Sequence, residues 1–225
     1  MKDKFSVIIR CKNEERWIGH TIQSVLDFIP HNELIIIDNN STDNSIEIVN
    51  SFRRDPDLLG NNEHYTDVKT VKLPTYSPGI ALNLGVRNCR FENILVISSH
   101  CVLKKFNLEE LVPKLDKYAG IFANQNPLYQ GKRITKRYLW KHFTNTETVD
   151  LYSDMEERHF FHNAAAIYKK KTLIKYPFNE NLVGKEDRYW ANHVIKNNEH
   201  TLYDPINFEI DHYYTSNGNT WKGIG

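Results

Sequence analysis

The chain has 225 residues, of which 40% are hydrophobic and 25% charged, values typical of a soluble globular protein with one large domain. The formal net charge of +1 implies no strongly charged partner and gives no argument for nucleic-acid binding. The three cysteines, Cys11, Cys89 and Cys101, lack CxxC spacing and favour free thiols in a reducing compartment. The first residues are charged rather than apolar, and no run approaches the roughly 20 apolar residues that span a bilayer. We therefore expect a cytoplasmic protein and leave peripheral membrane contact open.

Apolar runs alternate with helical patterns along the first hundred residues. Continuous apolar runs bounded by polar turn residues are typical of strands buried on both faces of a sheet. We expect such strands at residues 5–9, 34–37, 68–73 and 94–97. Helices are expected at residues 17–29, 43–52 and 80–89. This alternation predicts right-handed βαβ units at the start of a doubly wound sheet.

Asparagine side chains stand just before the first two of these helices. Asn13 is expected to cap the first helix, which Pro30 ends. Asn40, with Asp43 three residues later, is expected to cap the second.

The second half of the chain is less regular. Further strands are expected at residues 119–123, 163–168, 201–203 and 208–210, and helices at residues 106–118, 169–174 and 186–196. Residues 129–157 are rich in Lys, Arg, Thr and aromatic side chains, and we interpret them as an insertion over the site rather than a separate domain. The pattern predicts a single Rossmann-like α/β domain with a mostly parallel central sheet flanked by helices.

The first polar cluster that could carry chemistry is at Asp38, directly after a buried strand. Ligands of open α/β sheets bind at the carboxyl ends of the strands, where a carboxylate can accept hydrogen bonds from a ribose hydroxyl or a base. Capping of the following helix is the simpler alternative. The glycine fingerprint of dinucleotide folds is absent after the first strand, where residues 10–13 read RCKN. This argues against NAD and against a Walker-type phosphate loop.

The second cluster, Ser98-Ser99-His100-Cys101, follows the fourth strand. His100 could bind a metal, and His212 could supply a second imidazole. A lone histidine is more often structural, so spacing alone does not establish a divalent-ion site.

The third cluster is Glu186-Asp187, at the start of a helix. Acidic residues are favourable at a helix N-terminus, which needs no catalytic explanation. Alternatively, one carboxylate faces a pocket and acts as a general base toward an acceptor hydroxyl.

Together these clusters resemble the family 2 glycosyltransferases, which have the type A nucleotide-sugar fold. The resemblance covers most of the chain. Its segments are residues 6–15 (SVIIRCKNEE), 33–48 (ELIIIDNNSTDNSIEI), 77–86 (SPGIALNLGV) and 179–190 (NENLVGKEDRYW). Residues 33–48 are the most specific part. The resemblance implies a nucleotide-binding half at residues 1–101 and an acceptor-binding half at residues 102–225.

The resemblance also implies roles for individual residues. The implied nucleotide-binding residues are Cys11, Asn13, Glu14, Asp38, Asn40, Ser98 and Ser99. Asp187 is similar to the catalytic base of the inverting enzymes, which takes the proton of the acceptor hydroxyl, and Glu186 would support it or contact the acceptor.

The chain departs from the family at the metal motif. An Asp-x-Asp motif is usual after the fourth strand, whereas this chain has Ser98-Ser99-His100. This is similar to the Asp-Ser-His-Cys variant of polypeptide N-acetylgalactosaminyltransferases, with Ser98 in place of the first Asp. That comparison implies a weakened Mn²⁺ or Mg²⁺ site at His100 and His212. Metal-independent catalysis assisted by Lys or Arg, or a nucleoside monophosphate sugar as donor, are the alternatives.

The resulting hypothesis is an inverting glycosyltransferase that moves a sugar from a nucleotide-sugar donor to a hydroxyl of a glycan or glycolipid, in surface polysaccharide synthesis. The alternatives are a nucleotidyltransferase and an inert nucleotide- or sugar-binding domain. The sequence identifies neither the sugar nor the oligomeric state.

Overall fold

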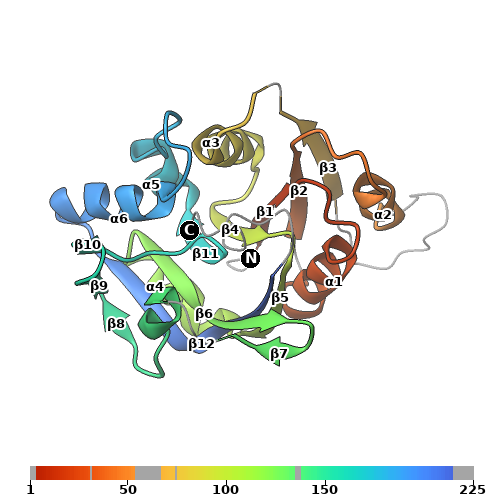
Figure 1. Cartoon of the computed structure of the whole chain (residues 1–225). Coiled ribbons are helices and arrows are strands. Elements are labelled where there is room, and N and C mark those ends of the chain that lie inside the picture. The colour runs from red at the N-terminus through yellow and green to blue at the C-terminus, as the bar shows by residue number, and fades with distance from the viewer. Residues whose placement is uncertain (1–3, 31, 54–66, 74, 135–137, 215–225) are drawn as a thin grey trace.

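The central sheet follows the strand order β3-β2-β1-β4-β11-β6-β12-β5 (Figure 1). The computed structural model describes residues 4–30, 32–53, 67–73, 75–134 and 138–214. The strands are β1 (Phe5–Cys11), β2 (Asn32–Asp38), β3 (Asp67–Lys72), β4 (Asn93–Ser98), β5 (Cys101–Phe106), β6 (Gly120–Tyr129), β7 (Lys132–Arg133), β8 (Thr148–Val149), β9 (Tyr152–Ser153), β10 (Arg158–His159), β11 (Ala165–Lys169) and β12 (Thr201–Tyr213). The helices are α1 (Ile18–Phe28), α2 (Ser45–Ser51), α3 (Pro78–Asn88), α4 (Leu108–Lys114), the 3₁₀ helix η2 (Tyr138–His142), α5 (Lys170–Lys175) and α6 (Glu186–Lys196).

The predicted α/β class, with a central sheet flanked by helices, is confirmed. Strands β3, β2, β1 and β4 are parallel, as the βαβ pattern predicts. The second half of the sheet is mixed rather than mostly parallel, since β11 runs antiparallel to β4 and β6, and β12 is parallel to β6 but antiparallel to β5. An apolar run reveals that a strand is buried on both faces, but not in which direction the strand runs.

Alternate residues of the parallel strands supply two separate cores. In β1, Val7 and Ile9 face the core beneath α1, α2 and α4, while Ile8 faces the core beneath α3, α5 and α6. Residues of β2 alternate in the same way. The sheet therefore lies between two helical layers, which explains why its strands read as unbroken apolar runs.

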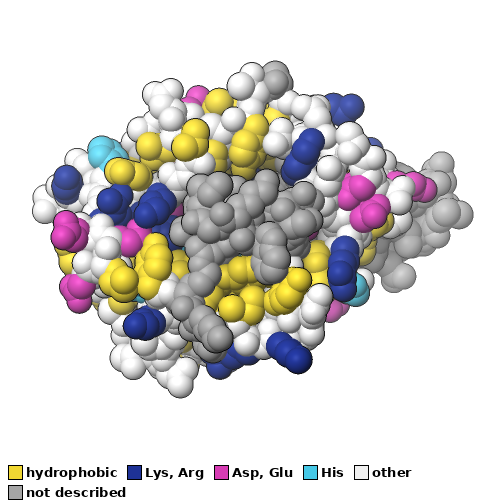
Figure 2. Space-filling model, viewed as in Figure 1, with side chains coloured by type: hydrophobic (Ala, Val, Ile, Leu, Met, Phe, Trp, Pro, Cys, Tyr) yellow, Lys and Arg dark blue, Asp and Glu magenta, His cyan; other side chains and the backbone are white. Residues whose placement is uncertain are grey.

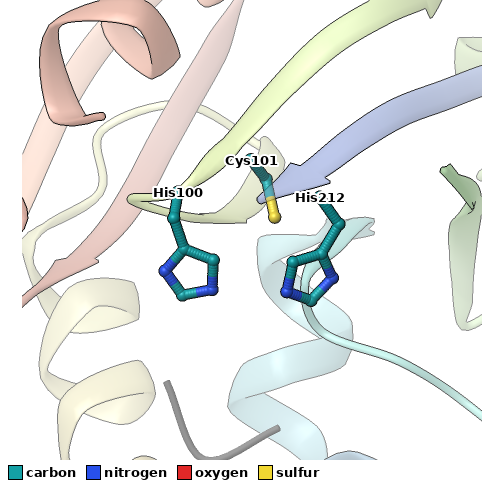
Figure 3. Close-up of side chains that lie close together, drawn as sticks. All are labelled: His100, Cys101 and His212. Carbon is teal, nitrogen blue, oxygen red and sulfur yellow. The ribbon is translucent and has the colours of Figure 1, made fainter. Parts of the chain in front are cut away.

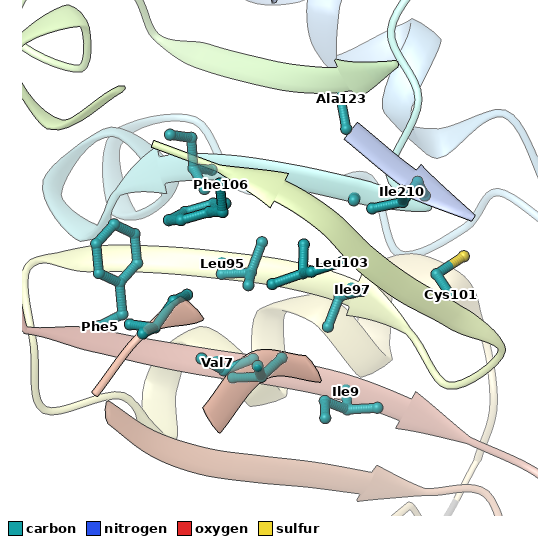
Figure 4. Packing of buried hydrophobic residues seen from close by; sticks show 14 of the residues in the cluster. Phe5, Val7, Ile9, Leu95, Ile97, Cys101, Leu103, Phe106, Ala123 and Ile210 are labelled. Carbon is teal, nitrogen blue, oxygen red and sulfur yellow. The ribbon is translucent and has the colours of Figure 1, made fainter. Parts of the chain in front are cut away.

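The sheet rolls back on itself between β4 and β5. Only residues 99 and 100 connect these strands, yet β11, β6 and β12 lie between them in the sheet. The interior of the roll is filled by apolar side chains, among them Phe5 and Phe106, whose rings meet edge to face at 5.7 Å (Figure 4). Helix α1 covers β5, and its Ser24 Oγ accepts a hydrogen bond from the Leu103 amide at 3.0 Å.

Both predicted asparagine caps are wrong. Helix α1 begins at Ile18, and α2 begins at Ser45 after Asn44. Asn13 and Asn40 instead have left-handed backbones, with φ of 53° and 54°. The side chain of Asn13 crosses to the neighbouring loop, where its Oδ1 accepts a hydrogen bond from the Thr42 amide at 2.7 Å.

Two predictions in the second half also need correction. The helix expected at residues 106–118 is shorter and is confined to α4, Leu108–Lys114. Its start is later than expected because Phe106 belongs to β5, a strand that was not predicted from the sequence. The two short closing strands are one long strand, β12, with a bulge between Asp204 and Glu209. The residues of this bulge interrupt the apolar pattern, so that the sequence of one strand resembles two short strands.

The face of the molecule in Figure 2 carries side chains of both charges. Figure 2 shows acidic and basic side chains interspersed over one face, with hydrophobic side chains above and below its centre. None of the helices in the described part of the chain combines the length and the apolar character that crossing a bilayer requires.

Candidate active site

A cleft of about 190 Å³ opens where the parallel strands β1 and β4 end. This is the edge at which open α/β sheets bind ligands. Its lining combines strand ends, the loop before α3, residues 162–164 and the start of α6. The lining residues are Arg10, Cys11, Lys12, Glu14, Ile37, Tyr76, Pro78, Ser98, Ser99, His100, His162, Asn163, Ala164, Gly184, Lys185, Glu186, Asp187, Arg188 and His212.

Two histidines far apart in sequence meet in this cleft. His100 lies in the turn between β4 and β5, and His212 lies on β12, where its backbone pairs with Cys101. The imidazole centroids are 5.1 Å apart, and Figure 3 shows both rings on the same side of the strand ends, with the Cys101 sulfur between them. One ligand atom from each of these three residues lies within 4.8 Å of the others.

The surroundings of the two imidazoles suit cation binding better than those of the thiol. Burial, together with neighbouring imidazoles, lowers the pKa of His212 well below its usual range, so His212 is neutral at pH 7 and can offer a lone pair. His100 directs Nδ1 to Glu14 Oε1 at 3.1 Å, which leaves its Nε2 for a ligand. Burial raises the pKa of the Cys101 thiol well above its usual range, which disfavours the thiolate. Two imidazoles suit Mn²⁺ or a softer cation better than Mg²⁺, which prefers oxygen ligands.

The acidic pair lines the same cleft as these imidazoles, at the start of α6. Both oxygens of Asp187 are held: Oδ1 accepts hydrogen bonds from the amide and Nη1 of Arg188, at 2.9 and 3.1 Å. Oδ2 accepts one from the Asn163 amide at 3.0 Å. Because each carboxylate oxygen has two lone pairs, Oδ2 keeps one for another partner. The carboxylate is therefore both fixed in position and able to accept a proton.

Glu186, the other member of the pair, is also buried. Burial and the adjacent charge of Asp187 raise the pKa of Glu186. Arg10, from the end of β1, opposes this through a 3.0 Å ion pair with Oε1 of Glu186. This contact ties β1 to α6 across the cleft.

A buried ion pair supports the acidic pair from behind. Nε of Arg188 donates to Oε1 of Glu156 at 3.0 Å, and both side chains are at least 96% buried. Glu156 comes from the region interpreted as an insertion over the site. Trp140, from the same region, packs its ring edge to face against His212 at 5.9 Å. These residues therefore contact the site, as expected.

The structure brings most of the expected site residues into one cleft. Those that line it are Cys11, Glu14, Ser98, Ser99, His100, His212, Glu186 and Asp187. Asp38, Asn13 and Asn40 lie beside it rather than in its lining. Asp38 pairs through its backbone with Cys11, is 2% exposed, and accepts a hydrogen bond from the Ser41 amide at 3.0 Å.

Several lining residues were not singled out from the sequence. Arg10 and Lys12 flank Cys11, and Lys185 and Arg188 flank the acidic pair, so a search for cations beside each motif would have found them. His162 had no such signal, since it only precedes an apolar strand.

The sequence was compared with models of known families. The model described as Glycosyl transferase family 2 matches residues 6–176. The chain belongs to this family. The matched segment runs from β1 to α5 and ends before the Glu186-Asp187 pair of this family 2 chain.

Curated relatives of this family 2 chain are longer proteins. It is 26% identical over 204 residues to the minor teichoic acid biosynthesis protein GgaA of Bacillus subtilis, covering 85% of this chain and 43% of GgaA. It is 27% identical over 99 residues to poly-beta-1,6-N-acetyl-D-glucosamine synthase of Staphylococcus epidermidis, covering 44% of this chain and 22% of that protein. The chain thus spans less than half the length of these relatives.

Solved structures share the fold. TarS 1-349 of S. aureus, in complex with UDP-GlcNAc, superposes with a TM-score of 0.69 at 21% identity, covering 96% of this chain and 60% of TarS 1-349. The mannosyltransferase PcManGT of Pyrobaculum calidifontis, in complex with GDP-Man and Mn²⁺, superposes with a TM-score of 0.67 at 16% identity. The superposition covers 97% of this chain and 59% of PcManGT. These neighbours extend the fold assignment to the whole described chain.

Proposed function

We propose that this family 2 chain is an inverting glycosyltransferase that moves a sugar from a nucleotide-sugar donor to a hydroxyl of a glycan or glycolipid in surface polysaccharide synthesis. The observation that carries this proposal is the shared cleft, whose lining combines a fixed carboxylate, Asp187, with the imidazoles of His100 and His212. The names of GgaA and poly-beta-1,6-N-acetyl-D-glucosamine synthase support an acceptor in a surface polymer.

Asp187 is the proposed general base. The acceptor oxygen attacks the anomeric carbon of the donor sugar while the bond from that carbon to the phosphate oxygen breaks. The acceptor proton passes to Oδ2 of Asp187, and the nucleotide leaves with the bonding electrons. Arg188 and the Asn163 amide hold the carboxylate in one orientation during this step.

Glu186 is proposed to act beside the base. Its ion pair with Arg10 keeps it near the strand end rather than near the solvent. From there Glu186 can accept a hydrogen bond from a hydroxyl of the acceptor, as the family resemblance implies.

The charge of the leaving nucleotide needs a counter-charge. A divalent cation held by His100 and His212, Mn²⁺ in preference to Mg²⁺, would neutralise the developing negative charge. Lys12, Lys185 and Arg10 also line the cleft and offer fixed positive charge. The nucleoside is proposed to lie toward Cys11, Glu14 and Ser98, with Asp38, Asn13 and Asn40 supporting the loops around it.

The proposal is tested by incubating the chain with radiolabelled UDP- and GDP-sugars and Mn²⁺, with and without wall or capsule glycans as acceptors. We expect slow nucleotide release from the correct donor and faster transfer when an acceptor is present. Asp187→Asn should reduce transfer by roughly 10²- to 10⁴-fold and leave donor affinity nearly unchanged. Asp116→Asn, at a side chain that is 73% exposed, is the matched control.

Different failures would have different meanings. Donor binding without release or transfer would favour an inert binding domain, and nucleotide transfer without sugar would favour a nucleotidyltransferase. Unchanged transfer by Asp187→Asn would show that another group is the base.

A further inference from the structure

A single glutamine lies between two of the histidines that line the cleft. Gln125, on β6, is 0% exposed. Its Oε1 lies 2.8 Å from Nδ1 of His212, and its Nε2 lies 3.0 Å from Nδ1 of His162. One buried amide therefore contacts both rings at the same ring position.

A backbone amide decides which way this glutamine points. The Ala164 N–H donates to Nδ1 of His162 at 3.2 Å. A backbone N–H can only donate, so Nδ1 of His162 carries a lone pair and no proton. The NH₂ group of Gln125 must then face His162, and its carbonyl oxygen must face His212. The reverse orientation would set a carbonyl oxygen against a lone pair.

The two rings are consequently fixed in opposite tautomers. His162 carries its proton on Nε2, whereas His212 carries its proton on Nδ1 and has a lone pair on Nε2. His212 is 3% exposed, and burial away from water disfavours the doubly protonated, charged form of an imidazole. Within the described residues, Nε2 of His162 has no hydrogen-bond partner, although the residue lines the cleft.

We propose that Gln125 is a positioning residue that gives the cleft one N–H donor, on His162, and one free lone pair, on His212. The lone pair serves the divalent cation, and the N–H of His162 binds an oxygen of the nucleotide sugar. This inference rests on the proposed glycosyl transfer for its ligands. The assignment of the tautomers does not depend on that function, because it follows from the hydrogen bonds alone.

The first test is spectroscopic. Long-range ¹H–¹⁵N correlation spectra of the metal-free, ¹⁵N-labelled chain at pH 7.5 report the tautomer of each ring, and His162→Gln and His212→Gln variants assign the signals. We expect the Nε2–H form for His162 and the Nδ1–H form for His212. The same tautomer for both rings, or the opposite assignment, would overturn the proposal.

The second test separates the two contacts of Gln125 by calorimetric titration with Mn²⁺ alone. Gln125→Leu removes both contacts, and we expect Mn²⁺ affinity to fall about 10- to 100-fold, as is typical when a ligand's supporting partner is lost. Gln125→Glu keeps an acceptor for His212 but sets a carboxylate against Nδ1 of His162. Because His212 keeps its acceptor, this variant should bind Mn²⁺ more tightly than Gln125→Leu, while the ¹⁵N signals of His162 shift as its Nδ1 loses the amide donor of Gln125.

Asn126→Ala is the matched control, because Asn126 is the next residue on β6 and bonds to Glu209 and Asp211 instead of the imidazoles. Wild-type Mn²⁺ affinity in Gln125→Leu would overturn the role of Gln125. The spectra of the wild-type chain still decide the tautomers if that variant does not fold. The expected tautomers in a chain that transfers no sugar would refute the proposed function and leave this assignment intact.

Discussion

Glu156 and Arg188 form a buried ion pair with a 3.0 Å hydrogen bond between Oε1 and Nε, directly behind Asp187. Because Arg188 keeps Asp187 as a counter-charge but its buried Nε loses its acceptor, Glu156→Ala should lower the free energy of unfolding by about 1–3 kcal/mol. The loss of support for Asp187 should also lower kcat more than it raises KM. Urea unfolding and steady-state kinetics measure the two effects.

Asp154→Ala, two residues earlier on an exposed turn, is the control and should leave stability within about 0.5 kcal/mol of wild type. A Glu156→Ala variant as stable as this control would mean that the ion pair is not formed in solution.

The two imidazoles should make activity depend on a divalent cation. His100→Ala and His212→Ala should each weaken Mn²⁺ binding by at least about 10-fold, since each removes one ligand. Mn²⁺ should support transfer better than Mg²⁺, and EDTA should abolish it reversibly. Full activity in EDTA, together with wild-type activity of His100→Ala, would refute the cation site. Titration calorimetry and transfer assays provide the measurements.

Acid should destabilise the metal-free protein through the buried histidines. Burial lowers the pKa of His162 and His212 well below the usual range, so below about pH 6.5 the unfolded chain binds more protons than the folded chain. Above that pH, the neutral histidines make their full contribution to the free energy of unfolding. As the pH falls below it, each histidine lowers this free energy by up to about 1.4 kcal/mol per pH unit. His162→Gln should reduce the slope between pH 6.5 and 5.5, measured by urea unfolding in EDTA. If the free energy of unfolding fell equally steeply with pH in His162→Gln and in the wild-type protein, the lowered pKa of His162 would be contradicted.

The three cysteines should be unreactive in the folded protein. Burial raises the pKa of Cys11 to about 11 and that of Cys89 to about 12, and it raises the pKa of Cys101 well above its usual range. At pH 8 the thiolate fraction of each is about one in a thousand or less. A thiol reagent such as DTNB should label no cysteine quickly in buffer and three in guanidinium. Fast stoichiometric labelling of the folded chain would contradict this burial.

Gly79, at the start of α3, should not tolerate a side chain. A Cβ there would overlap the backbone carbonyl of Asn179, which cannot move as a flexible side chain would. Ser77 fastens the same loop by donating to the Glu180 carbonyl at 2.6 Å. Gly79→Ala should cost about 1–3 kcal/mol and lower activity, because this loop leads to the acidic pair. Differential scanning calorimetry and transfer assays measure both.

Gly19→Ala is the corresponding control within α1. Its new Cβ would lie 3.3 Å from a methyl group of Ile48, and the gain in helix propensity offsets the crowding. If Gly19→Ala and Gly79→Ala lost stability to a similar extent, the effect would come from placing alanine in a helix and not from overlap with the loop at Asn179.

The sequence predicted the parts of the fold that local patterns specify. Helix α6 has the predicted bounds, because Gly184 and two acidic residues mark its start and an amphipathic pattern follows. The place of His100 in the cleft follows from the rule that ligands bind at strand carboxyl ends, whereas that of Asp187 was expected from the family resemblance. Strand β5 was missed because its residues, CVLKKF, follow a polar turn and have no clear period of two.

The supporting residues could not be predicted in the same way. Glu156 meets Arg188 across 32 residues, and Gln125 meets His212 across 87. Each is a polar residue whose role depends on which strand or helix packs beside it. A single sequence specifies these neighbours only through the complete topology.

The roll of the sheet links the order of synthesis to the assembly of the cleft. Strand β5 lies against β12, and the Tyr213 amide donates to the carbonyl of His100 at 3.0 Å, although more than a hundred residues separate them in the chain. Contacts of such high contact order form late in folding, and a nascent chain lacks β12 until nearly all of these residues have left the ribosome. Partly translated chains therefore hold the His100 turn without β12, and His100 and His212 meet only when β12 docks.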